Sequence, residues 1–427
     1  MTVCIYTEHK SQRLQYVVEH IFQHMLGVMY TLTDNQKDFL QAKSVQINYS
    51  STDLKAGIQI VPSGLLFETK IQPQKNFSPS KWDDLFCFFY SGHGEIPFDL
   101  FSASFYLLTR YEEYFPIQLD EHQRYDPKES LAMLYDFLEI PLIDLWVQKL
   151  RQLLISSNHL NEVEFPMREF RIIHTVDVDH PYLYRNKGIL IHLWGMIKDL
   201  ASKNYSALYE RLRTVFHLQP DPYLQALIQM HNHLKTRNAK YILFVFTGNY
   251  GKYGKKTIYP QRTYRQLLRN LKDVEFGLHP SYTSFLDKDQ IRVEKTKLEK
   301  ILRQQITKNR LHFLQMQIPI TYRILNDLGF TEDFTLGYSK HPGFRASTAI
   351  PFYFYDLEKE QNTPLLIRPF VVMDTCLFHH LKMNPEQILH KIQSLADICK
   401  LSGGDFTMIW HNSNFTEKFQ EYLSQIQ

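Results

Sequence analysis

The chain has 427 residues, enough for two or three domains with a sizeable buried core. Hydrophobic residues make up 44% of it and aromatic residues 14%, a composition that excludes a largely disordered protein. The formal net charge is only +3, from 48 basic and 45 acidic residues without a long basic run, so charge does not indicate a nucleic-acid partner.

The cysteines and the N-terminus indicate the cellular compartment. The four cysteines are far apart and form no C-x-x-C pair, which predicts free thiols in a reducing compartment. The first ten residues lack a basic segment followed by an apolar one, and no later stretch is uniformly apolar over about 18 residues. We therefore expect an unprocessed cytoplasmic protein without a membrane span.

Residues 1–165 mix strand and helix candidates in an irregular order. They predict an α/β or α+β accessory domain whose role the sequence does not disclose. The expected strands and helices of this domain are 3–6, 57–61 and 85–90, and 12–25, 98–114 and 141–155. The aromatic helix 98–114 ends in a charged cluster, residues 110–114. A solvated helix end is the interpretation we favour, and a surface facing a partner or the second domain is the alternative.

Residues 166–427 alternate short apolar strands with helices. The expected strands are 170–176, 241–246, 274–278, 311–316, 365–372 and 406–410, and the expected helices lie within 188–236 and at 262–271, 290–305, 320–328, 385–401 and 416–425. This alternation predicts parallel β-α units, arranged either as a barrel or as an open doubly wound sheet.

Two carboxylates follow the first of these strands. Asp177 and Asp179 are two residues apart in an extended segment, so their side chains should point to the same side. That arrangement suits one carboxylate holding a divalent metal while the other transfers a proton.

Further polar residues stand at the ends of other expected strands. His279 ends the third strand, Arg310 and His312 occur at the next one, and His411 ends the last. Active sites of parallel β-α folds gather at the carboxyl ends of strands. An Asp with two His is a ligand set that suits zinc or a similar divalent ion with open positions for water and substrate.

These residues carry a resemblance to a known family. Residues 174–181, 277–282, 309–314, 343–346 and 409–412 resemble motifs of the polysaccharide deacetylase superfamily, carbohydrate esterase family 4. Residues 96–114 are similar to an uncharacterised N-terminal domain found in a divergent bacterial branch of that superfamily. The resemblance spans nearly the whole chain.

The resemblance implies a distorted (β/α) barrel of about seven strands and metal-dependent hydrolysis of an N-acetyl or O-acetyl group on a sugar or another acetylated small molecule. It assigns Asp177 as general base and Asp179 as metal ligand, although the intervening Val178 leaves these two roles interchangeable. His411 corresponds to the general acid. Arg310 and Arg345 would orient the base or bind substrate anions, with a surface salt bridge as the other interpretation of Arg345.

The remaining positions of the resemblance concern substrate and metal. Tyr282 and Trp410 would contact the substrate. The second motif of the family normally supplies two histidines, but only His279 is present, and Thr283 and Ser284 stand where the other is expected. Either His312 completes the metal site, or the metal is weakly held or absent.

Two other functions stay open at this stage. One is hydrolysis of a non-sugar amide on the same fold, and the other is non-catalytic glycan binding through a decayed site. Three tyrosines in the expected loop 249–260 could stack on sugar rings, namely Tyr250, Tyr253 and Tyr259. The oligomeric state, the substrate and the identity of the metal are not disclosed by the sequence.

Overall fold

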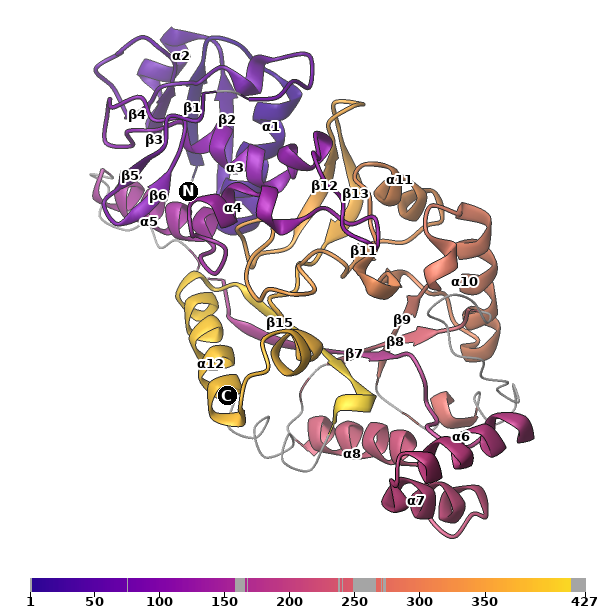
Figure 1. Cartoon of the computed structure of the whole chain (residues 1–427). Helices are drawn as coiled ribbons and strands as arrows, with labels where there is room; N and C mark the ends of the chain where they lie inside the picture. Colours follow the sequence, from indigo (N-terminus) through magenta and orange to yellow (C-terminus); the bar gives the residue numbers. More distant parts are fainter. Residues whose placement is uncertain are drawn as a thin grey trace.

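Two mainly parallel sheets, each carrying its own helices, form the fold (Figure 1). The computed structural model describes residues 2–74, 76–157, 166, 168–236, 239, 241–248, 266–269, 271 and 274–415. The expected loop 249–260, its three tyrosines, the expected helix 416–425 and the division near residue 165 lie outside the described residues. The two-domain division therefore stays a prediction.

The N-terminal part, residues 2–157, contains a four-stranded sheet in the order β2-β1-β3-β4, and every pair in it is parallel. Helix α3 is buried along its whole length, because its sequence is apolar or small on every face. The elements of this part are β1 Thr2–Thr7, α1 Gln12–Glu19, the π-helical turn His20–Met25, β2 Met29–Thr33, α2 Gln36–Gln41, β3 Val45–Tyr49, β4 Ile58–Ile60, β5 Ser80–Trp82, β6 Leu85–Cys87, α3 Leu100–Leu108, α4 Leu131–Leu134 and α5 Leu142–Ser156.

The C-terminal part contains a nine-stranded sheet in the order β12-β13-β11-β10-β9-β8-β7-β15-β14. Among the described strands of this sheet only the β12–β13 pair is antiparallel, so the predicted parallel β-α units are confirmed. The strands are β7 Arg171–Val178, β8 Tyr241–Phe246, β9 Glu275–His279, β10 Lys308–Asn309, β11 Glu332–Asp333, β12 Phe352–Asp356, β13 Gln361–Ile367, β14 Val372–Met373 and β15 Asp405–His411.

The expected closed barrel of about seven strands is not confirmed. Among the described residues, strand pairing leaves β12 and β14 as the two ends of the sheet. The single strand expected over 365–372 is divided into β13 and β14, because Pro369 has no N–H to donate to a neighbouring strand. One backbone hydrogen bond, from Phe370 N–H to the Leu336 oxygen at 3.0 Å, joins the segments that follow β11 and precede β14. The sheet thus curves so that these two segments meet, but no continuous ladder of hydrogen bonds between the described strands closes it into a barrel.

The helices of the C-terminal part lie mostly around the outside of this curved sheet (Figure 1). Helices α6 and α7 are the exception, since they extend beyond the others. The helices are α6 Ile189–Ala201, α7 Tyr205–Val215, α8 Pro222–Thr236, α10 Lys288–Leu302, α11 Ile320–Asp327 and α12 Pro385–Ser402. None of the described helices combines the length and the apolar character that a membrane span requires.

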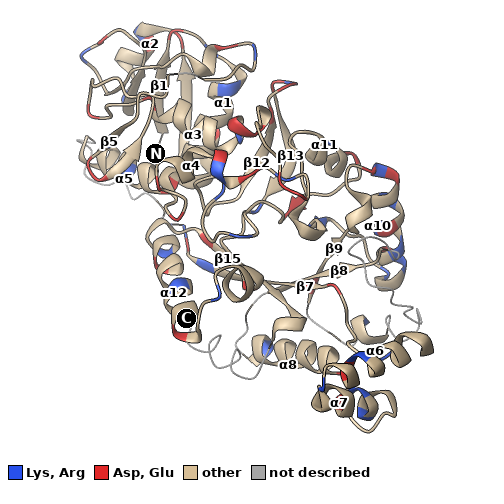
Figure 2. Cartoon of the chain, in the orientation of Figure 1, with Lys and Arg blue, Asp and Glu red and all other residues tan. Residues whose placement is uncertain are grey.

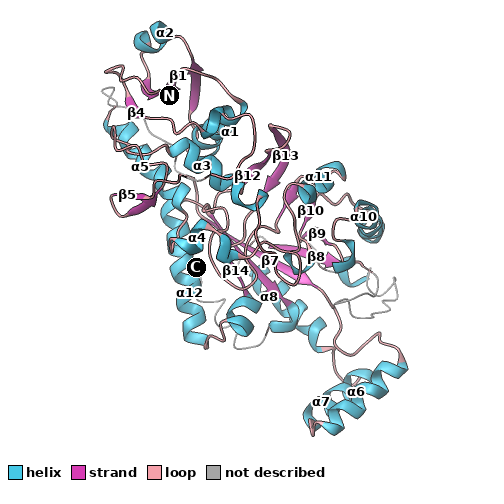
Figure 3. Ribbon diagram, turned by 45° about the horizontal axis from the view of Figure 1, so that its top comes forward, coloured by secondary structure: helices cyan, strands magenta, loops and turns pink. Residues whose placement is uncertain are grey.

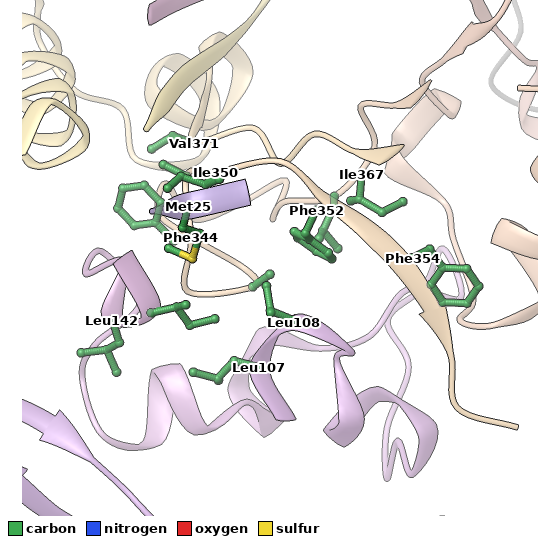
Figure 4. Close-up of a cluster of buried hydrophobic side chains, with 14 of the residues drawn as sticks. Met25, Leu107, Leu108, Leu142, Phe344, Ile350, Phe352, Phe354, Ile367 and Val371 are labelled. Atoms are coloured by element: carbon green, nitrogen blue, oxygen red, sulfur yellow. The ribbon is translucent and has the colours of Figure 1, made fainter. Parts of the chain in front are cut away.

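One hydrophobic cluster extends through both parts (Figure 4). Met25, Leu108 and Leu142 of the N-terminal part belong to it together with Phe344 and Phe352 of the C-terminal part. Burial of each such side chain contributes about 1.5–3 kcal/mol. The two parts are therefore held together by apolar packing rather than by a linker alone.

A buried ion network crosses the same interface and corrects the interpretation of residues 110–114. Glu113 accepts from Arg110 Nε at 2.8 Å and from Arg345 at 2.6 and 2.9 Å, and all three side chains are buried. The favoured solvated helix end is therefore wrong for Arg110 and Glu113. The cluster faces the C-terminal part, which was the alternative.

All four cysteines are buried and free, as their spacing predicts: Cys4, Cys87, Cys376 and Cys399.

Substituting Glu113→Gln tests the interface network. The change keeps the shape of the side chain but leaves Arg345 and Arg110 without their shared charge partner in a buried place. Breaking a buried pair in this way costs about 3–5 kcal/mol, so the midpoint of urea unfolding should fall clearly.

Asp327→Ala is the matched control, because the Asp327–Lys288 pair is exposed and screened by solvent. Its unfolding midpoint should stay close to that of the unsubstituted protein. Equal midpoints for the Glu113 and Asp327 variants would contradict a stabilising role of the network.

Candidate metal centre and active site

Strand register brings the expected site residues to one edge of the nine-stranded sheet. In the β15–β7 ladder His411 pairs with Asp177, and in the β8–β9 ladder Phe246 pairs with His279. Because β7, β9 and β15 run in the same direction, their carboxyl ends meet at this edge (Figure 1). The site is therefore assembled by the sheet, from residues more than 200 positions apart.

Asp179, His279 and His312 form the one group of possible metal ligands found among the described residues. His279 Nε2 lies 3.2 Å from Asp179 Oδ1, and His312 Nδ1 lies 3.5 Å from the same oxygen and 2.9 Å from His279 Nε2. Ligands of a tetrahedral zinc ion, each about 2.0–2.2 Å from the metal, are about 3.4 Å from one another. The three atoms thus have the spacing of ligands around one ion.

The tautomer of His279 also fits a metal site. Its Nδ1 lies 2.7 Å from the carbonyl oxygen of Arg310. Because a carbonyl oxygen only accepts, Nδ1 must carry a proton, which leaves the lone pair of Nε2 directed toward Asp179 and His312. A carbonyl that orients a ligating histidine is the usual support of a metal site.

Asp179 Oδ1 provides a second indication of fit. This buried oxygen accepts no hydrogen bond from the described residues. A buried carboxylate oxygen without a donor is costly unless a cation or water satisfies it. The residues present therefore fit a divalent metal ion.

The electrostatics of the three residues agree with cation binding. Burial acts to raise the pKa of Asp179, but His312 and His279 outweigh burial and hold that pKa well below its usual range. Burial lowers the pKa of His312 to about 4, which keeps the ring neutral and able to donate a lone pair. Burial also acts to lower the pKa of His279, but Asp177 and Asp179 raise it above its ordinary value, so a metal ion would replace a proton there.

An unusual turn brings His312 to the other two ligands. The prediction of a strand over 311–316 is wrong, because β10 ends at Asn309 and a short 3-10 turn, His312–Leu314, follows it. Phe313 and Leu314 have φ values of 58° and 54°, a left-handed conformation that costs bulky residues about 1–2 kcal/mol each. Such local strain is typical of functional sites, and here it occurs directly beside a candidate ligand.

Arg310 fixes the second carboxylate. Its fully buried guanidinium donates through Nη1 to Thr175 Oγ1 at 2.6 Å and to Asp177 Oδ1 at 3.1 Å. It also stacks on the Phe244 ring at 4.5 Å. Gly277 makes this packing possible, because a Cβ at that position would lie 2.4 Å from Phe244. Asp177 is thereby held at the pocket through one oxygen.

His411 is fixed by a residue that the sequence did not single out. His411 Nδ1 lies 2.7 Å from Asp374 Oδ1, and the backbone N–H of His411 donates to Asp374 Oδ2 at 2.7 Å. On the other side of the ring, Nε2 is 4.0 Å from Asp177 Oδ2. Asp374 directly follows β14, so its place after an apolar strand was the signal that could have identified it.

The Asp374 carboxylate determines the charge of His411. Burial acts to lower the pKa of His411, but Asp374 outweighs it and, with help from Asp179 and Asp177, raises that pKa to about 10. His411 is therefore an imidazolium at neutral pH, with a proton available on Nε2.

These residues line one pocket of about 380 Å³, which is within the size range of small-molecule sites. Asp177, Asp179, His279, His312 and His411 all contribute to its surface.

The N-terminal part supplies one wall of the pocket through Glu121, His122 and Arg124. Arg124 Nη1 donates to the Phe313 oxygen at 2.7 Å, and His122 Nδ1 lies 3.2 Å from the Tyr282 hydroxyl. The pocket is thus completed by both halves of the chain.

The rim of the pocket is polar. Lys340, His379 and His380 lie on it, and the two histidines come from a π-helical turn, Cys376–His380. Single π-helical turns frequently occur at functional sites. The rim therefore suits a ligand rich in hydrogen-bonding groups.

The three residues that were expected to bind substrate differ in their position relative to the pocket. Tyr282 lies beside the pocket, in contact with His122 and Phe313. Arg345 does not reach Asp177 or Asp179, since it is buried against Glu113. It therefore neither orients the expected base nor forms a salt bridge on the surface. Trp410 is buried at 1% exposure and does not line the pocket, because its position in β15 alternates away from that of His411.

Comparisons with known proteins give partial matches. A family of unknown function, DUF7033, matches residues 3–159. A putative polysaccharide deacetylase from Mycobacterium smegmatis is similar in structure, with 13% identity and a TM-score of 0.41 over 62% of this chain and 86% of that chain. A CE4 family pseudoenzyme from Bacillus anthracis has 11% identity and a TM-score of 0.31 over 61% of this chain and 60% of that chain.

A mutant of a CE4 family pseudoenzyme with restored enzymatic activity has 12% identity and a TM-score of 0.30, over 61% of each chain. Among curated proteins, none matches. The functional conclusion therefore depends on the geometry of the site.

Metal content tests the centre. The full chain, purified without a histidine tag, should bind about one zinc ion, and His279→Ala and His312→Ala should each weaken zinc binding by more than the roughly 10–100-fold expected for an outer-shell residue. Atomic emission after dialysis against zinc provides the measurement.

His379→Ala is the matched control, because His379 lines the same pocket outside the ligand group. It should retain the metal. Full zinc occupancy in the His312 variant would remove His312 from the ligand set.

Proposed function

We propose that this protein is a metal-dependent deacetylase of the polysaccharide deacetylase superfamily, which removes an acetyl group from an N-acetylated or O-acetylated sugar or glycan intermediate. One observation carries the proposal: a candidate metal-binding group, a carboxylate fixed by a buried arginine and a protonated histidine meet in one pocket. In metal-assisted hydrolysis of an amide, these three elements activate the water, accept its proton and protonate the leaving nitrogen.

Asp179, His279 and His312 would hold the metal, and their O and N donors suit zinc. When bound, such an ion lowers the pKa of a water molecule toward neutrality and polarises an acyl carbonyl. The proposal includes zinc as the cofactor and the cytoplasm as the cellular location.

Asp177 acts as general base in this proposal. Arg310 engages Oδ1 and leaves Oδ2 facing His411 across the pocket. A carboxylate fixed in this way can accept the proton of the attacking water without rotating away. The same contact distinguishes the roles of the two acids, because Asp177 is held by arginine whereas Asp179 lies against the two histidines.

His411 acts as general acid. An amine leaves poorly as an anion, so the departing nitrogen must receive a proton as the C–N bond breaks. His411 carries that proton at neutral pH because Asp374 stabilises the imidazolium. For an O-acetyl substrate the same proton would go to the departing alkoxide oxygen.

Separate substitution of the two acids tests these roles. Asp177→Asn should retain zinc and lose roughly 10²–10⁴-fold in turnover, as expected for removal of a general base. Asp179→Asn should lose both zinc and turnover. Zinc content and acetate release from oligomers of N-acetylglucosamine are measured on the same samples.

Equal loss of zinc in both variants would contradict the assignment of roles. Zinc binding without acetate release from any acetylated sugar, but with hydrolysis of a non-sugar amide, would leave the chemistry in place and change the substrate.

The pH profile tests His411. Because its pKa is raised to about 10, His411 should lose its proton, and the protein its activity, only as the pH rises through that value. Asp374→Asn removes the main cause of the increase, so the alkaline limb of kcat should move toward neutral pH.

Asn414→Ala is the control, since Asn414 only donates a hydrogen bond to Asp374 Oδ2 at 3.1 Å and leaves the carboxylate charge intact. Its alkaline limb should move much less. Unchanged limbs in both variants would exclude His411 as the group that titrates.

A further inference from the structure

Helix α6 carries a long apolar stripe that the described residues leave uncovered. Ile189, Leu190, Leu193, Trp194 and Ile197 are between 48% and 76% exposed. They recur at helical spacing and so lie on one side of the helix. Isolated exposed apolar side chains are ordinary, but a continuous stripe of this kind marks an interaction surface.

The opposite side of α6 is occupied by α7. Gly195, the one buried residue of the helix, packs so closely on Arg211 that an added Cβ would lie 2.4 Å from its guanidinium. Asp199, one turn further on, forms an ion pair with Arg211 at 2.7 Å. Because Gly195 and Asp199 face α7, the stripe must face away from it.

The hairpin of α6 and α7 stands apart from the rest of the molecule. It projects beyond the other helices in Figure 1, and the turned view in Figure 3 shows the same projection. The stripe is therefore accessible to a broad, flat surface as well as to a small partner.

The hairpin also carries a net positive charge. Residues 185–218 contain six Lys and Arg but only two Asp and Glu, a net charge of +4 in a chain whose total is +3. Lys198 and Lys203 are exposed, and Figure 2 shows blue residues along both helices. Asp199 is already paired with Arg211, and Glu210 accepts from the Tyr184 hydroxyl at 3.1 Å, which leaves the outward charge positive.

An apolar helix face with tryptophan, close to the exposed Lys198 and Lys203, matches the chemistry of an anionic bilayer surface. Trp194 on α6 and Tyr205 and Tyr209 on α7 are all exposed by more than 60%, and such rings favour the headgroup region. The helix has 13 residues, too few for the roughly 20 that cross a bilayer, so it would lie in the plane of the interface.

We propose that the α6–α7 hairpin docks this protein on an anionic lipid bilayer, with the apolar stripe of α6 inserted among the acyl chains and the basic residues against the headgroups. This inference is independent of the proposed chemistry.

Vesicle flotation of the full chain tests the proposal. The protein should float with vesicles of phosphatidylcholine and phosphatidylglycerol and bind pure phosphatidylcholine roughly tenfold or more weakly. The triple substitution Leu190→Ser, Trp194→Ser and Ile197→Ser should lower binding to the mixed vesicles by about tenfold or more. Lys198→Glu with Lys203→Glu should lower it by about fivefold for each charge removed.

Ile117→Ser with Lys300→Glu is the matched control, because Ile117 is 92% exposed and Lys300 is an exposed lysine outside the hairpin. It should leave flotation unchanged. Zinc content and the unfolding midpoint, measured for every variant, verify that the fold is intact.

Three outcomes would overturn the proposal. They are absence of flotation with the mixed vesicles, equal loss in the control, and a dimer in light scattering that the triple substitution dissociates while no form of the protein floats. The last outcome would assign the stripe to a second copy of the chain.

Discussion

The buried contact between Arg310 and Asp177 is the constraint on which the site depends. Arg310 lies inside the curve of the sheet, where its Nε donates to the Phe334 oxygen at 3.0 Å while Nη1 reaches Thr175 and Asp177. One side chain thereby connects β7 with the segments that follow β10 and β11. A buried guanidinium without these partners would be strongly destabilising, so the fold and the orientation of Asp177 are stabilised by the same contacts.

The N-terminal part is integral to this arrangement. It shares the hydrophobic cluster, it contributes Glu113 to the buried ion network, and its residues 121–124 form a wall of the pocket. A protein that needs both halves to bury its core and to shape its pocket should respond to substitution in either half. The region that matches the DUF7033 family model, residues 3–159, is thus a structural component of the candidate site.

The sequence predicted the site well where residues stand at the ends of regular strands. Asp177, Asp179, His279 and His411 follow apolar segments that become β7, β9 and β15, and parallel strands bring such positions together. The sequence-based prediction failed where tertiary contacts determine whether a side chain reaches the pocket. Asp374 follows a strand of only two residues, and Trp410 and Arg345 were assigned from motif position alone, whereas packing buries both away from the pocket.

By itself, the sequence determined the alternation of strands and helices and the residue types available at the strand ends, because apolar periodicity and Gly or Pro positions act locally. Only the tertiary structure decided that His312 joins Asp179 and His279, since His312 lies in a short turn after β10 and not in the strand that its sequence pattern predicts. It also decided that Arg110 and Glu113 are buried and that the apolar stripe of α6 is exposed. Burial depends on which surfaces meet across long separations in the chain, and local pattern does not contain that information.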